Sequence, residues 1–166
     1  MTAAPSPAPG RLDLELLVRV DVVSTALFAA AAVGASVAPD VLQVPYAALS
    51  MLLFAVGTVA FLWAFGVAVA RSRDEYVSTT GVFFLTGGVL TGAPRTRLLA
   101  CLAAQTVVAV AAASVQLYTA AAFGIMAPMF GLGLAGLAGA RFGRFEARPD
   151  EAGAGTEPDT TGPPER

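Results

Sequence analysis

Long apolar segments dominate the hydropathy pattern of the chain. They run from about Val20 to Ala38, Pro45 to Ala70, Leu98 to Tyr118 and Ala121 to Ala140. About 20 apolar residues in a helix cross the hydrocarbon core of a bilayer, so each segment is long enough to span a membrane. Pro128 lies inside the fourth segment and predicts a kink there. The pattern therefore predicts an all-α fold, a transmembrane four-helix bundle.

The stretch 76–94 between the second and third segments is ambiguous, because it is moderately apolar but rich in glycine and threonine. If it crossed the membrane, Arg71 and Arg73 would face the opposite side from Arg95 and Arg97. The positive-inside rule argues against that arrangement. With four crossings all ten arginines share one side. We therefore expect both termini to be cytoplasmic and this long inner loop to be re-entrant or to lie along the interface.

Composition agrees with a membrane location. The chain of 166 residues is 56% hydrophobic and only 13% charged, whereas a soluble domain carries about 25% charged residues. Pro-, Gly- and acid-rich ends predict disordered tails at 1–11 and 146–166, which leaves a transmembrane domain at 12–145. Ser36-Val37-Ala38 resembles a signal-peptide cleavage site, but Pro39 follows it, so we expect the first helix to be retained. The expected location is the plasma membrane, as a multi-pass protein.

The residue types that are missing exclude much chemistry. The chain has no histidine, lysine or asparagine, and Cys101 is its only cysteine. This removes the commonest general base, Schiff-base chemistry, disulfides and cysteine metal sites. No basic patch indicates nucleic acid. We therefore expect no catalytic residue, no metal and no cofactor, and we interpret the protein as non-enzymatic.

Small residues recur every four positions in two of the predicted helices, and such stripes allow helices to approach closely in a membrane. Those in the first helix are Ala26, Ala30 and Gly34, and those in the fourth are Gly131, Ala135 and Gly139. We expect these two helices to form a tight pair, although the stripes fit a homodimer equally well. The GxGxxG string at 131–136 lies inside an apolar helix, which argues against a dinucleotide site.

Polar residues at membrane depth are the candidate functional residues. Gln105 and Gln116 share one face of the third helix and are expected to point into the bundle. Asp21 has no cation at helical spacing on its own helix, so its partner must come from elsewhere. Arg71, Arg97, Arg141 and water are the alternatives. Asp21 is then either an interfacial tether between helix ends or a site for a proton or cation.

The arginines at the ends of the inner loop suit anionic lipid headgroups. They are Arg71, Arg73, Arg95 and Arg97.

The strings FFLTGG at 83–88, APMFGLGL at 127–134 and GARFG at 139–143 resemble small uncharacterised membrane proteins of actinobacteria. The resemblance covers 19–145 and implies a membrane location without an activity. In length and helix number the chain is also similar to small multidrug transporters. Those carry a glutamate within the first helix, whereas here the acid is Asp21, near the predicted start of the helix.

Two functions remain open from the sequence. The first is an accessory or scaffold subunit of a membrane assembly, with the lipid bilayer and another membrane protein or a second copy as partners. The second is a small proton-coupled transporter that acts as a homodimer. Neither the partner, the substrate nor the oligomeric state follows from the residues.

Overall fold

The computed structural model describes residues 9–73, 75–115 and 119–145. These residues are mostly helical and form no strand. The helices are α1 (Pro9–Val37), α2 (Pro39–Arg71), α3 (Thr79–Phe84), α4 (Ala93–Val115), the 3₁₀ helix η1 (Ala120–Met126) and α5 (Pro128–Phe142). Four of the helical stretches are long and apolar enough to span a membrane, namely α1, α2, α4 and η1 with α5. The prediction of an all-α fold with four such helices is confirmed, and the predicted tails lie almost entirely outside the described residues.

The first two helices begin earlier than their hydropathy indicates. α1 begins at Pro9, so the segment before Val20 continues directly into the membrane helix. α2 begins at Pro39, where proline fits because the first helical turn needs no backbone N–H, and Pro45 lies inside it. Asp21 therefore lies in the interior of a long helix and not near its start.

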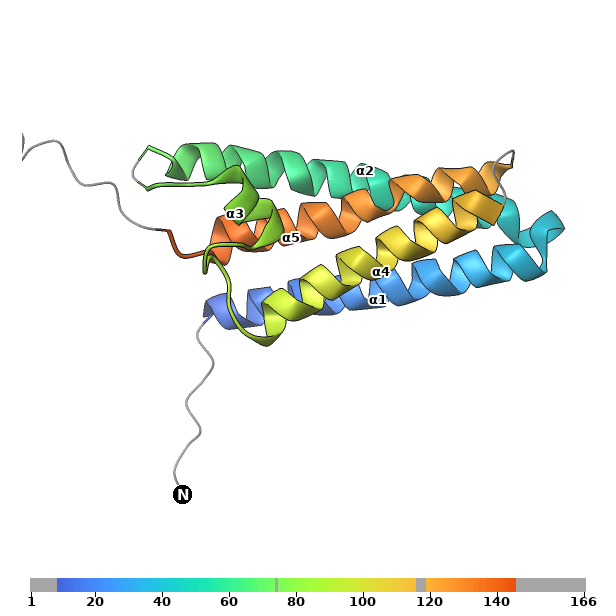
Figure 1. Cartoon of the computed structure of the whole chain (residues 1–166), viewed down its shortest axis with the longest axis horizontal. Helices are drawn as coiled ribbons and strands as arrows, with labels where there is room; N and C mark the ends of the chain where they lie inside the picture. The colour runs from blue at the N-terminus through green and yellow to red at the C-terminus, as the bar shows by residue number, and fades with distance from the viewer. Residues whose placement is uncertain (1–8, 74, 116–118, 146–166) are drawn as a thin grey trace, which may run out of the picture.

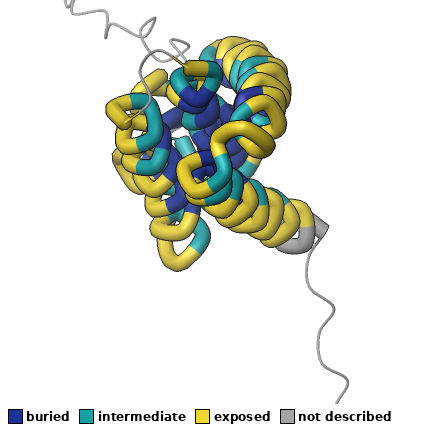
Figure 2. Tube along the Cα trace, turned by 90° about the vertical axis from the view of Figure 1, so that its right-hand side faces the viewer, coloured by how far each residue is buried: buried dark blue, intermediate teal, exposed yellow. Residues whose placement is uncertain are grey.

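The spanning helices run antiparallel to their neighbours in the chain (Figure 1). One end of the bundle carries the start of α1, the end of α5 and the segment between α2 and α4, and we call it the arginine end. The turn between α1 and α2 lies at the opposite end. Buried residues run along the middle of the bundle, and exposed residues surround them (Figure 2). Large apolar side chains such as Leu62 and Trp63 lie on this outer surface, as expected where lipid is the solvent.

Glycines bring α2 and α5 into the closest helix contact of the bundle. A Cβ atom on Gly57 would lie 2.5 Å from the backbone of Phe130, and one on Gly133 would clash with the carbonyl oxygen of Gly57. In α1, by contrast, Ala26 and Ala30 are exposed. The expected tight pairing of the first helix with the fourth is corrected accordingly, because α5 packs most closely against α2 while α1 packs mainly against α4.

The loop between α2 and α4 folds back against α5. Phe83 fills the space beside Gly136, and the carbonyl oxygen of Val82 lies against Gly139. Leu85 is fully buried in a left-handed conformation, with φ of 52°, and its carbonyl oxygen accepts a hydrogen bond of 2.8 Å from Nε of Arg95. The glycines of α5 therefore serve the packing of this loop as well as the packing of α2.

Candidate functional site

A cluster of buried and half-buried polar side chains on α1 and α4 also reaches the backbone of α5. Asp21 and Gln105 are completely buried. Nε2 of Gln105 donates to Oδ1 of Asp21 at 3.2 Å and to the hydroxyl oxygen of Thr25 at 2.8 Å. The hydroxyl of Thr25 in turn donates to the carbonyl oxygen of Asp21 at 2.7 Å. We call Asp21, Thr25 and Gln105 the polar cluster.

The cluster also closes a break in the fourth membrane-spanning stretch. The chain passes from η1 into α5 at Pro128, so the kink expected at this proline is a change of helix type. The first turn of a helix leaves backbone N–H groups without partners. Oε1 of Gln105 accepts the N–H of Gly131 at 3.1 Å and satisfies one of them. A side chain of α4 thus caps α5 inside the bundle.

This geometry also bears on the GxGxxG string, which is not in the middle of one continuous helix but begins in the first turn of α5. The amide of Gly131 is occupied by Gln105, and a Cβ atom at Gly131 would lie only 2.8 Å from Oε1 of Gln105. The space beside this glycine is therefore filled by protein.

Asp21 is not paired with an arginine in the described part of the chain. Its Oδ1 accepts from Gln105, while Oδ2 is buried and has no hydrogen-bond partner among the described residues. Arg71, one of the expected partners, binds elsewhere. Its Nη1 donates to the carbonyl oxygen of Ala140 at 2.8 Å, and its Nη2 forms a salt bridge of 2.8 Å with Glu75. Among the described residues, therefore, no arginine forms an interfacial tether with Asp21.

The depth of the cluster follows from helix geometry. Gly131 precedes Arg141 by ten residues, and Gln105 follows Arg97 by eight. At 1.5 Å per residue these distances are about 15 Å and about 12 Å along the helix axes. The hydrocarbon core of a bilayer is about 30 Å thick. If Arg97 and Arg141 mark one interface, Gln105 and Gly131 lie about 12 to 15 Å inside the membrane, although Arg19 is only two residues from Asp21 on α1.

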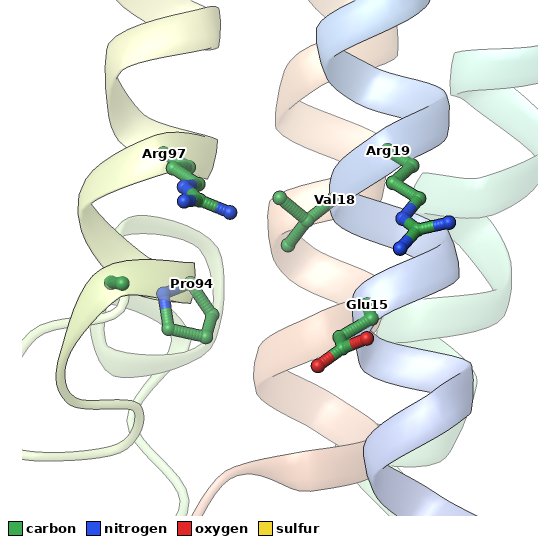
Figure 3. Close-up of a pocket in the computed structure, with 6 residues that line it drawn as sticks. Glu15, Val18, Arg19, Pro94 and Arg97 are labelled. Carbon is green, nitrogen blue, oxygen red and sulfur yellow. The ribbon is translucent and has the colours of Figure 1, made fainter.

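A cavity opens below the cluster, between the arginine ends of α1 and α4 (Figure 3). We call it the α1/α4 cavity. Its volume is about 350 Å³, and it is lined by Glu15, Val18, Arg19, Ala93, Pro94 and Arg97. Val18 precedes Asp21 by three residues, which corresponds to about 4.5 Å along the helix. Less than one helical turn of α1 therefore separates the cavity from the level of Asp21.

The remaining candidate residues have different surroundings. Gln116 lies outside the described residues. Ala135 and Gly139 are buried in the packing of α5, and Gly34 lies beside Leu42 at the start of α2. Of the arginines expected to bind lipid headgroups, Arg71 and Arg95 bond within the protein, whereas Arg73 and Arg97 are exposed.

Sequence reasoning missed Thr25 and the amide of Gly131 as members of the site. Thr25 follows Asp21 by four residues and lies on the same face of α1, so the spacing in the sequence could have identified it as a member of the site. The role of the Gly131 amide depends on where α5 begins, which hydropathy does not mark, since η1 and α5 form one apolar run.

Comparison of the chain with protein families, with curated proteins and with solved structures finds no significant match to any of them.

Proposed function

We propose that this integral membrane protein binds and releases a proton at Asp21, and that it acts as a small proton-coupled transporter. The observation that supports this proposal is the carboxyl group of Asp21, which is fully buried near the middle of the bundle with one oxygen unpartnered. Ionisable groups at such depth are costly and mark proton or ion pathways in membrane proteins.

The surroundings of Asp21 favour a proton over a metal cation as the ligand. Without a basic partner an ionised carboxylate is expensive to bury, and uptake of a proton removes that cost. A hard metal cation needs about six oxygen ligands, whereas the polar cluster offers the carboxyl group and few neutral oxygens. Nothing in this role requires catalysis, and we propose the protein as non-enzymatic.

Access to Asp21 supports the same role. The α1/α4 cavity reaches Val18, less than one helical turn from Asp21, from the arginine end. In the proposed mechanism a proton enters through this cavity, and movement of α1 relative to α4 completes the path. We place the arginine end and both termini in the cytoplasm and the protein in the plasma membrane, because the positive-inside rule then holds.

The second candidate function is an accessory or scaffold subunit of a membrane assembly. The observation that favours it is the exposed position of Ala26 and Ala30 on α1, since small residues allow close approach of another helix. The same face would serve a homodimer of the transporter. The actinobacterial resemblance fits both candidates and assigns neither.

Proton flux in proteoliposomes tests the proposal, with wild type compared with Asp21→Asn. Asparagine keeps an oxygen that accepts from Gln105, so this variant is expected to retain the fold while it loses the site that a proton can occupy. The expected result is flux in wild type that is abolished in a variant of unchanged thermal stability. Equal flux in both proteins, or none in wild type together with a stable heteromeric complex isolated in mild detergent, would favour the accessory subunit.

A further inference from the structure

The α1/α4 cavity carries a feature that proton binding at Asp21 does not use, namely two arginines from different helices. Figure 3 shows the guanidinium group of Arg97 extending from α4 toward Val18 of α1, while the side chain of Arg19 lies on the side of α1 farther from α4. Both line the cavity, and both are exposed. An open, positively charged recess therefore lies at the arginine end.

These two arginines differ from others at the same end in having no internal partner. Arg71 bonds with Glu75 and with carbonyl oxygens at the end of α5, and Arg95 bonds with the carbonyl oxygen of Leu85. Neither Arg19 nor Arg97 forms a hydrogen bond or ion pair with a described residue. Their donors remain available to a ligand.

The walls of the cavity favour an anion of modest charge. The first turn of α4, at Ala93 and Pro94, forms one wall, and the N-terminal end of a helix carries partial positive charge. Glu15 is the single acidic residue of the lining and extends toward Pro94 in Figure 3. With two arginines and one glutamate, the lining carries a net charge of +1. Glu15 therefore weakens the attraction of an anion but does not abolish it.

We propose that the α1/α4 cavity binds a phosphate group through Arg19 and Arg97. Arginine presents a planar fork of N–H donors that matches the oxygens of phosphate, and two such forks from two helices can hold one group. A volume of about 350 Å³ is larger than a phosphate group alone and leaves room for a polar substituent. The phosphate belongs either to an anionic phospholipid, whose headgroups lie at this depth beside the arginines, or to a phosphate free in solution.

The site has a structural consequence besides its position on the proposed proton path. A phosphate held by both arginines would join the ends of α1 and α4, which pack against each other along the bundle. It would also account for the placement of Arg19 so near the membrane interior, since its long side chain can extend toward the headgroups. The assignment does not depend on whether Asp21 carries a proton.

Native mass spectrometry of the full chain in non-ionic detergent tests the proposal, with phosphatidylglycerol, diacylglycerol and inorganic phosphate as separate probes. Diacylglycerol shares the acyl chains but lacks the phosphate. We expect Arg19→Gln and Arg97→Gln each to weaken phosphatidylglycerol binding about tenfold, which corresponds to about 1.4 kcal/mol. Glu15→Gln should strengthen it several-fold. Arg73→Gln is the matched control, because Arg73 is exposed at the same end but does not line the cavity.

Each outcome separates the possible ligands. Binding of phosphatidylglycerol that depends on Arg19 and Arg97 identifies a lipid headgroup, whereas binding of inorganic phosphate alone, with the same dependence, identifies a free anion. If Arg73→Gln weakened phosphatidylglycerol binding as much as Arg19→Gln and Arg97→Gln do, the binding would reflect general attraction to charge, and the proposed site would be wrong. It would also be wrong if diacylglycerol bound as tightly as phosphatidylglycerol, because the acyl chains alone would then account for binding. The readout is binding, so it is independent of proton flux through Asp21.

Discussion

Gln105 makes the polar cluster possible because its amide has both donors and an acceptor. Nε2 serves Asp21 and Thr25 on α1, while Oε1 serves the amide of Gly131 on α5. A glutamate of the same shape lacks the donors and would place a second acid beside Asp21. One side chain of α4 thus connects two other helices and also caps one of them.

Replacement of Gln105 by leucine should therefore destabilise the protein. The change leaves Asp21 and the amide of Gly131 without their partner, and a buried unsatisfied polar group costs about 1–3 kcal/mol. Thermal unfolding in detergent measures the effect. Thr106→Val is the matched control, since Thr106 is the next residue on α4 but is exposed and bonds only within its own helix. Equal stability of both variants would show that the cluster contributes nothing to the fold.

Arg71 acts on α5 from the other end of that helix. Its guanidinium group binds the carbonyl oxygens of Ala140 and Gly143, where the last turn of a helix leaves acceptors unpaired. Arg71→Gln should lower the free energy of unfolding by about 1–3 kcal/mol, because charge-assisted hydrogen bonds are lost. Arg73→Gln should change it by less than about 0.5 kcal/mol. Chemical unfolding in mixed micelles distinguishes the two, and identical curves would contradict the capping role.

At the scale of helices, α5 is the central element of the bundle because its glycines remove side-chain bulk on several faces. Gly133 accommodates α2, Gly136 accommodates Phe83, and Gly139 accommodates the backbone at Val82. Dispersion contacts drive such packing in a membrane, where lipid tails are as apolar as the helix surface. The short helix α3 and its loop are held in place by this surface.

The contact between α2 and α5 can be tested with a pair of glycines on the same helix. Gly57→Ala should destabilise the protein, because the added Cβ atom would lie 2.5 Å from the backbone of Phe130. Gly66→Ala meets no atom within 4 Å and should be neutral or slightly stabilising, since alanine favours helix by up to about 1 kcal/mol. Thermal stability of the two variants is the measurement. A loss of stability in Gly66→Ala that matches Gly57→Ala would contradict the proposed packing.

Hydropathy was sufficient to identify the four helices that are long and apolar enough to span a membrane, because the lipid-facing surface of such a helix has to be apolar along its whole length. Which of these helices pack against each other could not be predicted from hydropathy. Small residues at a spacing of four occur on the exposed face of α1, at Ala26 and Ala30, as well as on buried faces of α5. The spacing alone does not distinguish a face that meets a helix from one that meets lipid, so the pairing of α1 with α5 was wrong.

The candidate site was predictable in part. The inward position of Gln105 followed from the cost of an amide group in hydrocarbon. The position of Asp21 did not, because it was expected near the start of its helix and lies in the interior of α1. Their contact with each other depends on the relative rotation of α1 and α4, which the sequence does not encode in any local pattern. The expectation of an arginine partner for Asp21 failed because no local pattern showed which groups Arg71 would meet. Its guanidinium group binds the carbonyl oxygens at the end of α5 instead.

For the whole molecule, the antiparallel arrangement places the segment between α2 and α4 at the same end as the start of α1 and the end of α5 (Figure 1). The arginines of the described residues gather at this end, and the positive-inside rule therefore predicts that it faces the cytoplasm. The opposite end holds the turn between α1 and α2 and the first turn of α2 with Asp40, and neither carries an arginine.

Cysteine labelling of intact cells tests this orientation. In a background in which Cys101 is replaced by alanine, a membrane-impermeant reagent should label Asp40→Cys from outside. Ser78→Cys should react only after the membrane is permeabilised. Both residues are exposed in the structure, so differences in burial do not confuse the comparison. Labelling of Ser78→Cys in intact cells would reverse the assignment of sides.

The central claim is that the buried carboxyl group of Asp21 takes up a proton inside the membrane. Infrared difference spectroscopy of the protein in lipid measures this directly, because a protonated carboxylic acid has a carbonyl stretching band that a carboxylate lacks. We predict such a band in wild type, lost in Asp21→Asn and retained in a control variant of an exposed acid, Asp40→Asn. Absence of the band in the wild type across the accessible pH range, or its survival in Asp21→Asn, would contradict the claim.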